Sequence, residues 1–225
     1  MRYLSEIIKK DENFEALSSA VEGGKCPVLC TGTGRVNAAN IISQCVLDFQ
    51  LPVLIICPDE NEAERLSADI EGFCGRGPDM LAAREMTFYS TEAVSKSSEQ
   101  SRLETMYRIA SAKGELVIAP AEALLQRSIP RDILLGCGRK IEMGGEYDLG
   151  EIVASLTAAG YERASQVEGT GQFALRGGIL DFWSPAEPDA VRCEFFGDEV
   201  DSMGYFDVQN QRRTEVIDSA VIIPA

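Results

Sequence analysis

The sequence predicts a two-part chain: an α/β domain with a parallel sheet, followed by a smaller α+β domain with a mainly antiparallel sheet. Up to about residue 137, short apolar runs alternate with amphipathic stretches, and this alternation is typical of parallel strands covered by helices. After Gly138, short strands with turn residues between them dominate. Two glycines at 136 and 138 mark the junction, so we expect domains at 1–137 and 138–225.

The first domain is expected to contain four strands and three helices. The apolar runs that predict strands are 27–31, 53–57, 86–89 and 116–119. Helical patterns run from 36 to 49, from about 60 to 73 and from about 100 to 112. Asp59 precedes the second helix and is expected to cap it, because an Asp side chain accepts hydrogen bonds from first-turn N–H groups. Glu60 and Glu62 suit the positive N-terminal end of that helix.

The second domain is expected to contain one helix among short strands. The helix is predicted over 149–159, where apolar residues recur with a helical period. The strands are predicted at 139–143, 162–166, 172–176, 179–183, 191–196, 200–205 and 215–223. Such a pattern favours an antiparallel sheet with one helix on it.

Composition excludes several classes of function. The 225 residues include 21 Lys and Arg, 36 Asp and Glu, and no histidine, for a net charge of −15. Without histidine there is no imidazole base and no usual catalytic zinc ligand, and a negative field opposes nonspecific binding to nucleic acid. Seven scattered cysteines without a C-x-x-C pair indicate buried reduced thiols, and no apolar run reaches the ~20 residues that span a bilayer. We expect a cytoplasmic protein with no catalytic residue, no metal site and no membrane partner.

A glycine turn between the first predicted strand and helix has the setting of a phosphate loop. A functional loop reads G-x-x-x-x-G-K-[ST], in which Lys reaches the phosphates and the hydroxyl holds Mg²⁺. Here Gly34 takes the second glycine, Arg35 the lysine and Val36 the hydroxyl position, and no Walker-B acidic pair follows 116–119. We therefore predict a degenerate P-loop at Gly32, Gly34, Arg35 and Val36 that does not hydrolyse ATP. Two interpretations stay open: a weak anion site at the helix N-terminus, or a tight turn that needs small residues.

The strand predicted at 191–196 carries an arginine and a phenylalanine on its polar side. Alternate side chains of this strand are apolar and suit a core: Val191, Cys193 and Phe195. The opposite face holds Arg192, Glu194 and Phe196, and Arg176 at the end of a neighbouring strand is expected to join them. Arginine beside an exposed aromatic ring is typical of protein-binding hot spots. The alternative is that the helix at 149–159 covers Phe196 and that Arg192 pairs with Glu194 or another surface acid.

Several stretches resemble the N-terminal region of the bacterial transcription-repair coupling factors, the Mfd family. They are QFALRGGILDF from 172, VRCEFFGDEVDS from 191 and FDVQNQR from 206, and IAPAEALLQR from 118 and GYER from 160 match the same family upstream. The excision repair protein UvrB shares this module, but it keeps an intact P-loop and an aromatic-rich DNA-clamping hairpin that this sequence lacks. A UvrB-type fragment and a residual nucleotide-binding P-loop domain are therefore the alternatives.

The resemblance implies a degenerate ATPase-like domain similar to UvrB domain 1A, followed by a domain similar to UvrB domain 2 that docks UvrA. Two arginines and a phenylalanine of the family's UvrA-facing surface fall on Arg176, Arg192 and Phe196. The family implies RNA polymerase and DNA as further partners, through later domains that include an ATP-dependent DNA translocase of helicase type. We expect those domains, with their ATP and Mg²⁺, to be absent here. The chain is then a non-catalytic, cofactor-free module that recruits UvrA in transcription-coupled nucleotide excision repair in the bacterial cytoplasm.

Overall fold

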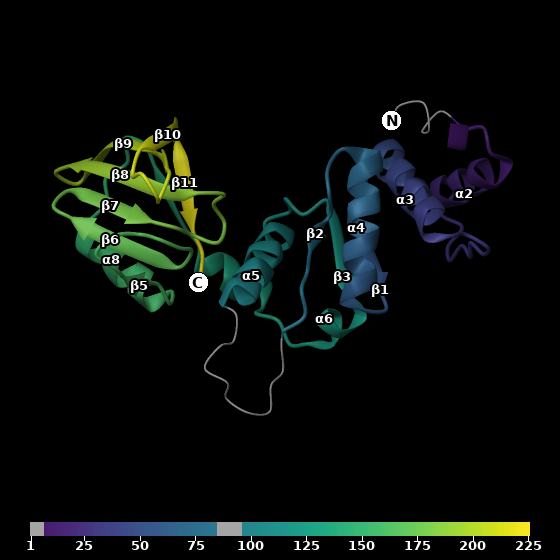
Figure 1. Ribbon diagram of the computed structural model, residues 1–225, viewed down its shortest axis with the longest axis horizontal. Helices are drawn as coiled ribbons and strands as arrows, with labels where there is room; N and C mark the ends of the chain where they lie inside the picture. The colour runs from purple at the N-terminus through teal and green to yellow at the C-terminus, as the bar shows by residue number, and fades with distance from the viewer. Residues whose placement is uncertain (1–6, 85–95) are drawn as a thin grey trace. The chain divides into compact units, whose positions relative to one another are not determined.

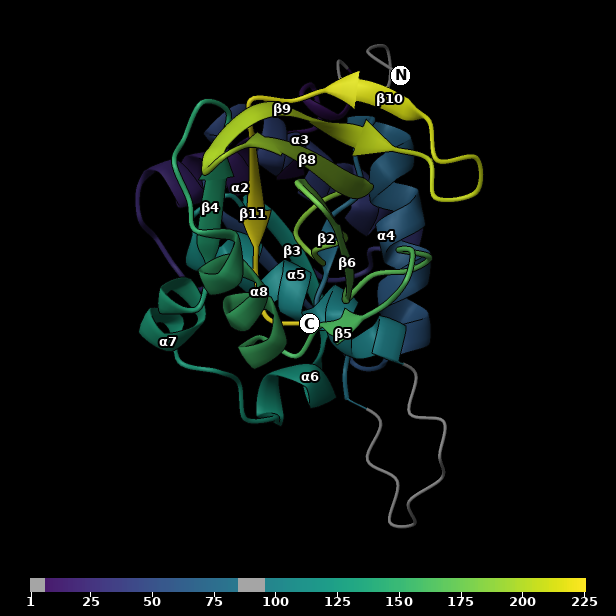
Figure 2. The ribbon, with the colours of Figure 1, turned by 90° about the vertical axis from the view of Figure 1, so that its left-hand side faces the viewer.

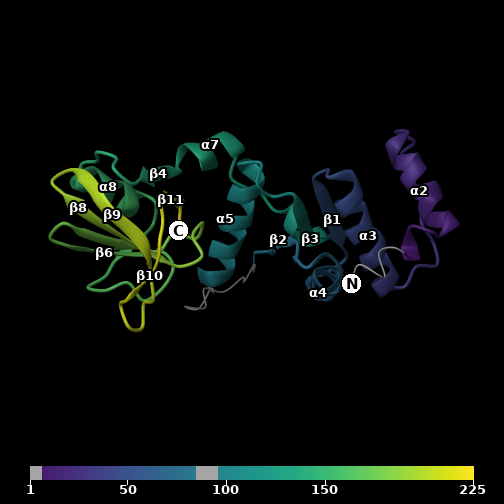
Figure 3. The same cartoon turned by 90° about the horizontal axis from the view of Figure 1, so that it is seen from above.

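The computed structural model describes residues 7–84 and 96–225, which divide into two compact units (Figure 1). The first unit comprises residues 1–83 and 114–126, and the second comprises 84–113 and 127–225. The units differ from the division predicted at residue 137. Helix α5 (Lys96–Ala110) packs against α7 (Arg131–Gly136), and Arg131 donates a hydrogen bond to the Ala110 carbonyl at 2.9 Å (Figure 3). These contacts place both helices in the second unit.

The first unit contains a three-stranded parallel sheet in the order β1-β3-β2, which confirms the predicted parallel pairing. Its strands are β1 (Val53–Cys57), β2 (Asp79–Met80) and β3 (Leu116–Pro120), and its helices are α2 (Glu12–Glu22), α3 (Arg35–Phe49), α4 (Glu60–Cys74) and α6 (Ala121–Leu125). Helix α4 packs on α3, β1 and β3 (Figure 1). The core between them is built from aliphatic side chains that include Ile55, Ile70 and Ile118.

Most predicted elements of this unit are confirmed. Strands β1 and β3 and helices α3 and α4 lie where the sequence predicts them, and the Asp59 carboxylate accepts the Glu62 N–H at 2.9 Å as the expected cap. The strand predicted at 27–31 is wrong: this segment is irregular, and Leu29 is 86% exposed. An apolar run indicates a strand only where a neighbouring strand can pair with it. The strand expected at 86–89 lies outside the described residues.

The second unit contains a six-stranded sheet in the order β10-β9-β8-β7-β6-β5, in which β5 and β6 form the one parallel pair. A second sheet pairs β4 with β11 (Figure 2). The elements are β4 (Arg139–Glu142), α8 (Leu149–Ala158), β5 (Glu162–Arg163), β6 (Gln172–Arg176), β7 (Ile179–Phe182), β8 (Ala190–Phe196), β9 (Glu199–Phe206), β10 (Arg213–Val216) and β11 (Ser219–Ile222). The predicted mainly antiparallel sheet and its helix are confirmed. The single strand expected at 215–223 is wrong, because β10 and β11 belong to different sheets.

The large sheet has two unequal faces. One face packs on α8 and forms the main core, with fully buried side chains from α8 and the central strands: Ile152, Leu156, Leu180, Phe182, Cys193 and Met203 (Figure 2). The opposite face carries a smaller cluster of Val167, Ala174, Ala190 and Phe206. The rest of that opposite face is therefore available for polar side chains.

Candidate functional site

The strand register brings Asp181 and the two predicted arginines onto the face of the sheet opposite α8. Asp181 of β7 lies directly across from Arg192 of β8, and on its other side it faces Ala174 of β6. Arg176 comes two residues after Ala174, so it points to the same face. The hairpin after Arg176 turns at Gly177, whose φ of +61° favours glycine. The turn places Arg176 diagonally opposite Asp181.

Asp181 holds both arginines. Its side chain is 1% exposed, and its Oδ1 accepts a hydrogen bond from Arg192 Nε at 2.7 Å. Its Oδ2 accepts from Arg192 Nη2 at 2.9 Å and from Arg176 Nη2 at 2.6 Å. We call Arg176, Asp181 and Arg192 the Arg–Asp cluster. Two positive charges and one negative charge leave the cluster with a formal charge of +1, within a chain of charge −15.

Arg192 is enclosed on its remaining sides. It donates to the Gln211 carbonyl at 3.2 Å and to Gln211 Oε1 at 2.9 Å, and its guanidinium lies 4.4 Å from the centre of the Phe206 ring. Only 16% of its side chain is exposed. The hydrogen bond to Asp181 raises the pKa of Arg192, while burial acts in the opposite direction. Arg192 is therefore a permanently charged and largely enclosed group.

Phe196 is uncovered at the end of β8. The residue is 83% exposed, so the alternative in which the helix at 149–159 covers it is wrong. Arg192 pairs with buried Asp181, so the alternative in which it pairs with Glu194 or another surface acid is wrong. Glu194 instead accepts a hydrogen bond from Arg213 at 3.0 Å. Arg176 remains 46% exposed. An exposed ring therefore lies on the same sheet face as a half-exposed arginine.

Sequence reasoning missed Asp181, although a signal was present. In the strand sequence Ile-Leu-Asp-Phe at 179–182, Asp181 is a lone carboxylate in an otherwise apolar run. A buried carboxylate needs a partner, and the antiparallel neighbour of this strand offered an arginine. Only the register of β7 against β8 shows that the two residues are opposite one another.

The four residues of the predicted degenerate P-loop have different surroundings. Gly32 has a φ of +75° and Gly34 precedes α3 as its N-cap, without a side-chain hydrogen bond. Arg35 Nε donates to Asp69 of α4 at 2.7 Å, and this hydrogen bond raises the pKa of Arg35. Val36 is 52% exposed. Arg35 is thus engaged with a carboxylate of its own unit.

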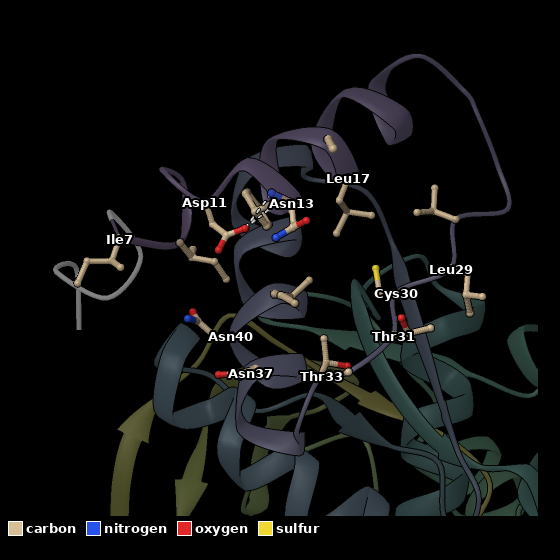
Figure 4. A pocket seen from close by; sticks show the side chains of 16 residues that line it. Ile7, Asp11, Asn13, Leu17, Leu29, Cys30, Thr31, Thr33, Asn37 and Asn40 are labelled. Carbon is tan, nitrogen blue, oxygen red and sulfur yellow. Dashed lines mark hydrogen bonds between the residues drawn. The ribbon is translucent and has the colours of Figure 1, made fainter.

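A cavity of about 690 Å³ lies beside this turn, between α2 and α3 (Figure 4). Its lining mixes apolar and polar side chains, among them Leu17 of α2, Thr31 and Thr33 of the loop, and Asn37 of α3. Gly32 lines the cavity, whereas Gly34, Arg35 and Val36 do not. The two P-loop positions that act on phosphate and Mg²⁺ in a functional loop therefore lie outside the cavity wall.

We also looked among the described residues for metal sites, membrane-spanning helices and reactive cysteines. Within 7–84 and 96–225 no three metal-binding side chains come together, and no helix there is long and apolar enough to cross a membrane. All seven cysteines are free, but the expectation that they are buried holds only for Cys57 and Cys193 and is wrong for the exposed Cys26, Cys30 and Cys137. Burial raises the pKa of Cys193 to about 12, so this thiol stays protonated at neutral pH.

Comparison with known proteins points to DNA repair. Residues 140–225 match the family described as UvrB interaction domain. The transcription-repair-coupling factor of Escherichia coli (strain K12) is 30% identical over 91% of this chain, and that of Staphylococcus haemolyticus (strain JCSC1435) is 30% identical over 99%. The same factor of Bacillus subtilis (strain 168) is 24% identical over 100% of the chain.

The chain spans 18–19% of the length of these three relatives. The matched UvrB interaction domain begins at residue 140, inside the second unit, and includes the whole Arg–Asp cluster and Phe196. The expected kinship with the coupling factors is confirmed. Residues 140–225 match the UvrB interaction domain family, and the chain is similar over nearly its whole length to the bacterial transcription-repair-coupling factors.

Proposed function

We propose that this chain is the UvrA-docking module of a transcription-repair coupling factor, and that Arg176, Arg192 and Phe196 form its UvrA-docking patch. The observation that carries the proposal is the exposure of Phe196, 83%, on the sheet face that also presents Arg176. A phenylalanine that contributes nothing to the core and shares a sheet face with an exposed arginine has the composition of an interface hot spot. The patch lies within the part of the chain that matches the UvrB interaction domain.

The proposal assigns the other activities to other parts of a longer protein. The relatives are about five times as long as this chain, which spans 18–19% of them. RNA polymerase binding and ATP-dependent translocation on DNA belong to those parts, and the chain acts as a non-catalytic, cofactor-free module in the bacterial cytoplasm. Its charge of −15 agrees with a role in binding protein, because it repels the phosphate backbone.

Direct titration tests the docking function. We expect the isolated chain to bind purified UvrA with saturable heat in calorimetry without nucleotide, because the docking patch requires no bound ligand to be presented. Addition of ATP to both solutions is expected to leave the affinity of the chain itself unchanged. Arg163→Ala is a matched arginine control, since Arg163 pairs with Phe173 on the α8 side of the sheet. Absence of binding at micromolar concentrations of both proteins would contradict the proposal.

The cavity beside the predicted degenerate P-loop favours a second candidate function, residual nucleotide binding. Its volume of about 690 Å³ would admit a nucleotide. Two observations oppose it: Asp69 engages Arg35, and the Val36 side chain has no hydroxyl oxygen for Mg²⁺. Both observations favour the interpretation of this segment as a tight turn that needs small residues over its interpretation as a weak anion site.

A thermal melt with Mg-ATP tests whether the chain binds nucleotide. We expect Mg-ATP at millimolar concentration to leave the melting temperature unchanged. A ligand at 100 times its Kd stabilises a protein by about 2.7 kcal/mol. For a chain of this size that corresponds to a rise of roughly 5–10 °C. A rise of this size would support nucleotide binding, and Asn37→Ala, which alters the cavity wall, would then have to abolish it.

A further inference from the structure

The two arginines of the Arg–Asp cluster differ in how far they are available to a partner protein. Arg192 makes four hydrogen bonds, two to Asp181 and two to Gln211, out of the five N–H groups of a guanidinium. Arg176 is bound through Nη2 to Asp181 and remains 46% exposed. Arg192, at 16% exposure, presents little surface.

We propose that Asp181 is a positioning residue that fixes Arg192 and orients Arg176, so that Arg176 and Phe196 are the side chains that contact an acidic surface of UvrA. The inference rests on the proposed docking function and assigns a chemistry to the partner's surface. Arg176 carries the exposed part of the cluster's +1 charge, and the complementary groups for a guanidinium are carboxylates. Phe196 adds an apolar contact on the same sheet face.

The geometry explains why a carboxylate is needed at position 181. A free arginine side chain samples many rotamers, and ordering it on binding lowers affinity. The 2.6 Å bond from Arg176 Nη2 to Asp181 Oδ2 orders this side chain before the partner arrives. Asp181 is itself held by the two bonds from Arg192, so the three residues form one fixed unit.

The charge of Asp181 allows a test that separates positioning from simple charge attraction, because the two predict opposite changes in the affinity for UvrA. Asp181→Asn raises the formal charge of the cluster from +1 to +2, as two arginines then face a neutral amide. If the patch acted only through its positive field, UvrA would bind this variant more tightly. If Asp181 acts by positioning, UvrA binds it less tightly despite the added charge.

The decisive measurement is a double-mutant cycle by calorimetry against UvrA, with Asp189→Asn as an exposed control of the same chemistry. We expect Asp181→Asn and Arg176→Ala each to weaken binding about tenfold, and the double variant to bind about as Arg176→Ala alone does. This non-additivity is a readout that a purely structural role of Asp181 would not produce. Parent-like or tighter binding of Asp181→Asn, or additive losses, would overturn the inference.

A second readout does not involve UvrA. The Arg192 Nε–H group, hydrogen-bonded to Asp181, is expected to give a slowly exchanging NMR signal that is absent in Arg192→Lys and lost in Asp181→Asn. A rapidly exchanging signal in the parent would overturn the inference. If Arg176→Ala and Phe196→Ala both bind UvrA like the parent, the proposed function itself fails, and the NMR result still reports on the cluster. Should Asp181→Asn not fold, Arg192→Lys replaces it, and parent-like affinity in that variant would also overturn the inference.

Discussion

Phe196→Ala is expected to lower the affinity for UvrA about 30-fold, equivalent to about 2 kcal/mol, without lowering the stability of the chain. The ring is 83% exposed in the free chain, so its removal takes no contact from the core. A surface substitution of this kind changes the free energy of unfolding by within about 0.5 kcal/mol. Calorimetric titration gives the affinity, and a denaturant melt gives the stability.

Ile133→Ala is a suitable control for this prediction. Ile133 lies on α7, outside the strand that carries Phe196, and is also an exposed apolar residue, at 57%. A general tendency of apolar side chains to adhere to UvrA would make both substitutions equally harmful. Docking through the patch requires a loss at Phe196 alone. Equal affinities of Phe196→Ala and the parent would remove Phe196 from the proposed patch.

Local patterns predicted much of the fold because they depend on neighbouring residues. The Asp59 cap and the helix that follows it are specified within a single turn, and the apolar run of β3 is buried at every position. The run at 27–31 is also mainly apolar but lies outside the sheet. The position of α5 beside α7 likewise depends on contacts between residues far apart in the sequence, so the predicted junction at 137 does not coincide with the edge of a compact unit.

Only part of the candidate site could be predicted, because alternation along one strand is a local pattern and contacts between strands are not. Alternation along β8 correctly placed Phe196 on the face opposite the core, since alternation is a property of one strand. It also placed Arg192 on an exposed surface, which is wrong at 16% exposure. Gln211, which encloses Arg192, follows β9, and Asp181 comes from β7. Neither neighbour is visible without the strand register and the path of the chain after β9.

Asp181→Ala is expected to be the most destabilising single change in the Arg–Asp cluster, with a loss of about 3–5 kcal/mol in the free energy of unfolding. The substitution leaves Arg192 largely enclosed without its counterion, and an uncompensated charge in such a place is strongly unfavourable. Urea denaturation measures the loss. Asp189→Ala, at an exposed position, is the control and should change the stability by less than about 0.5 kcal/mol.

The matched experiment replaces the whole cluster with apolar residues of similar size, as Arg176→Met, Asp181→Leu and Arg192→Met together. Because pairing two buried charges offsets only part of their desolvation, this variant is expected to unfold within about 1 kcal/mol of the parent or to be more stable. It should nevertheless lose UvrA binding, since no guanidinium remains for the partner's carboxylates. If the triple variant is as stable as the parent but does not bind UvrA, the charges of the cluster serve docking. A triple variant as unstable as Asp181→Ala would mean instead that the cluster holds the sheet together, which the proposed positioning role of Asp181 does not require.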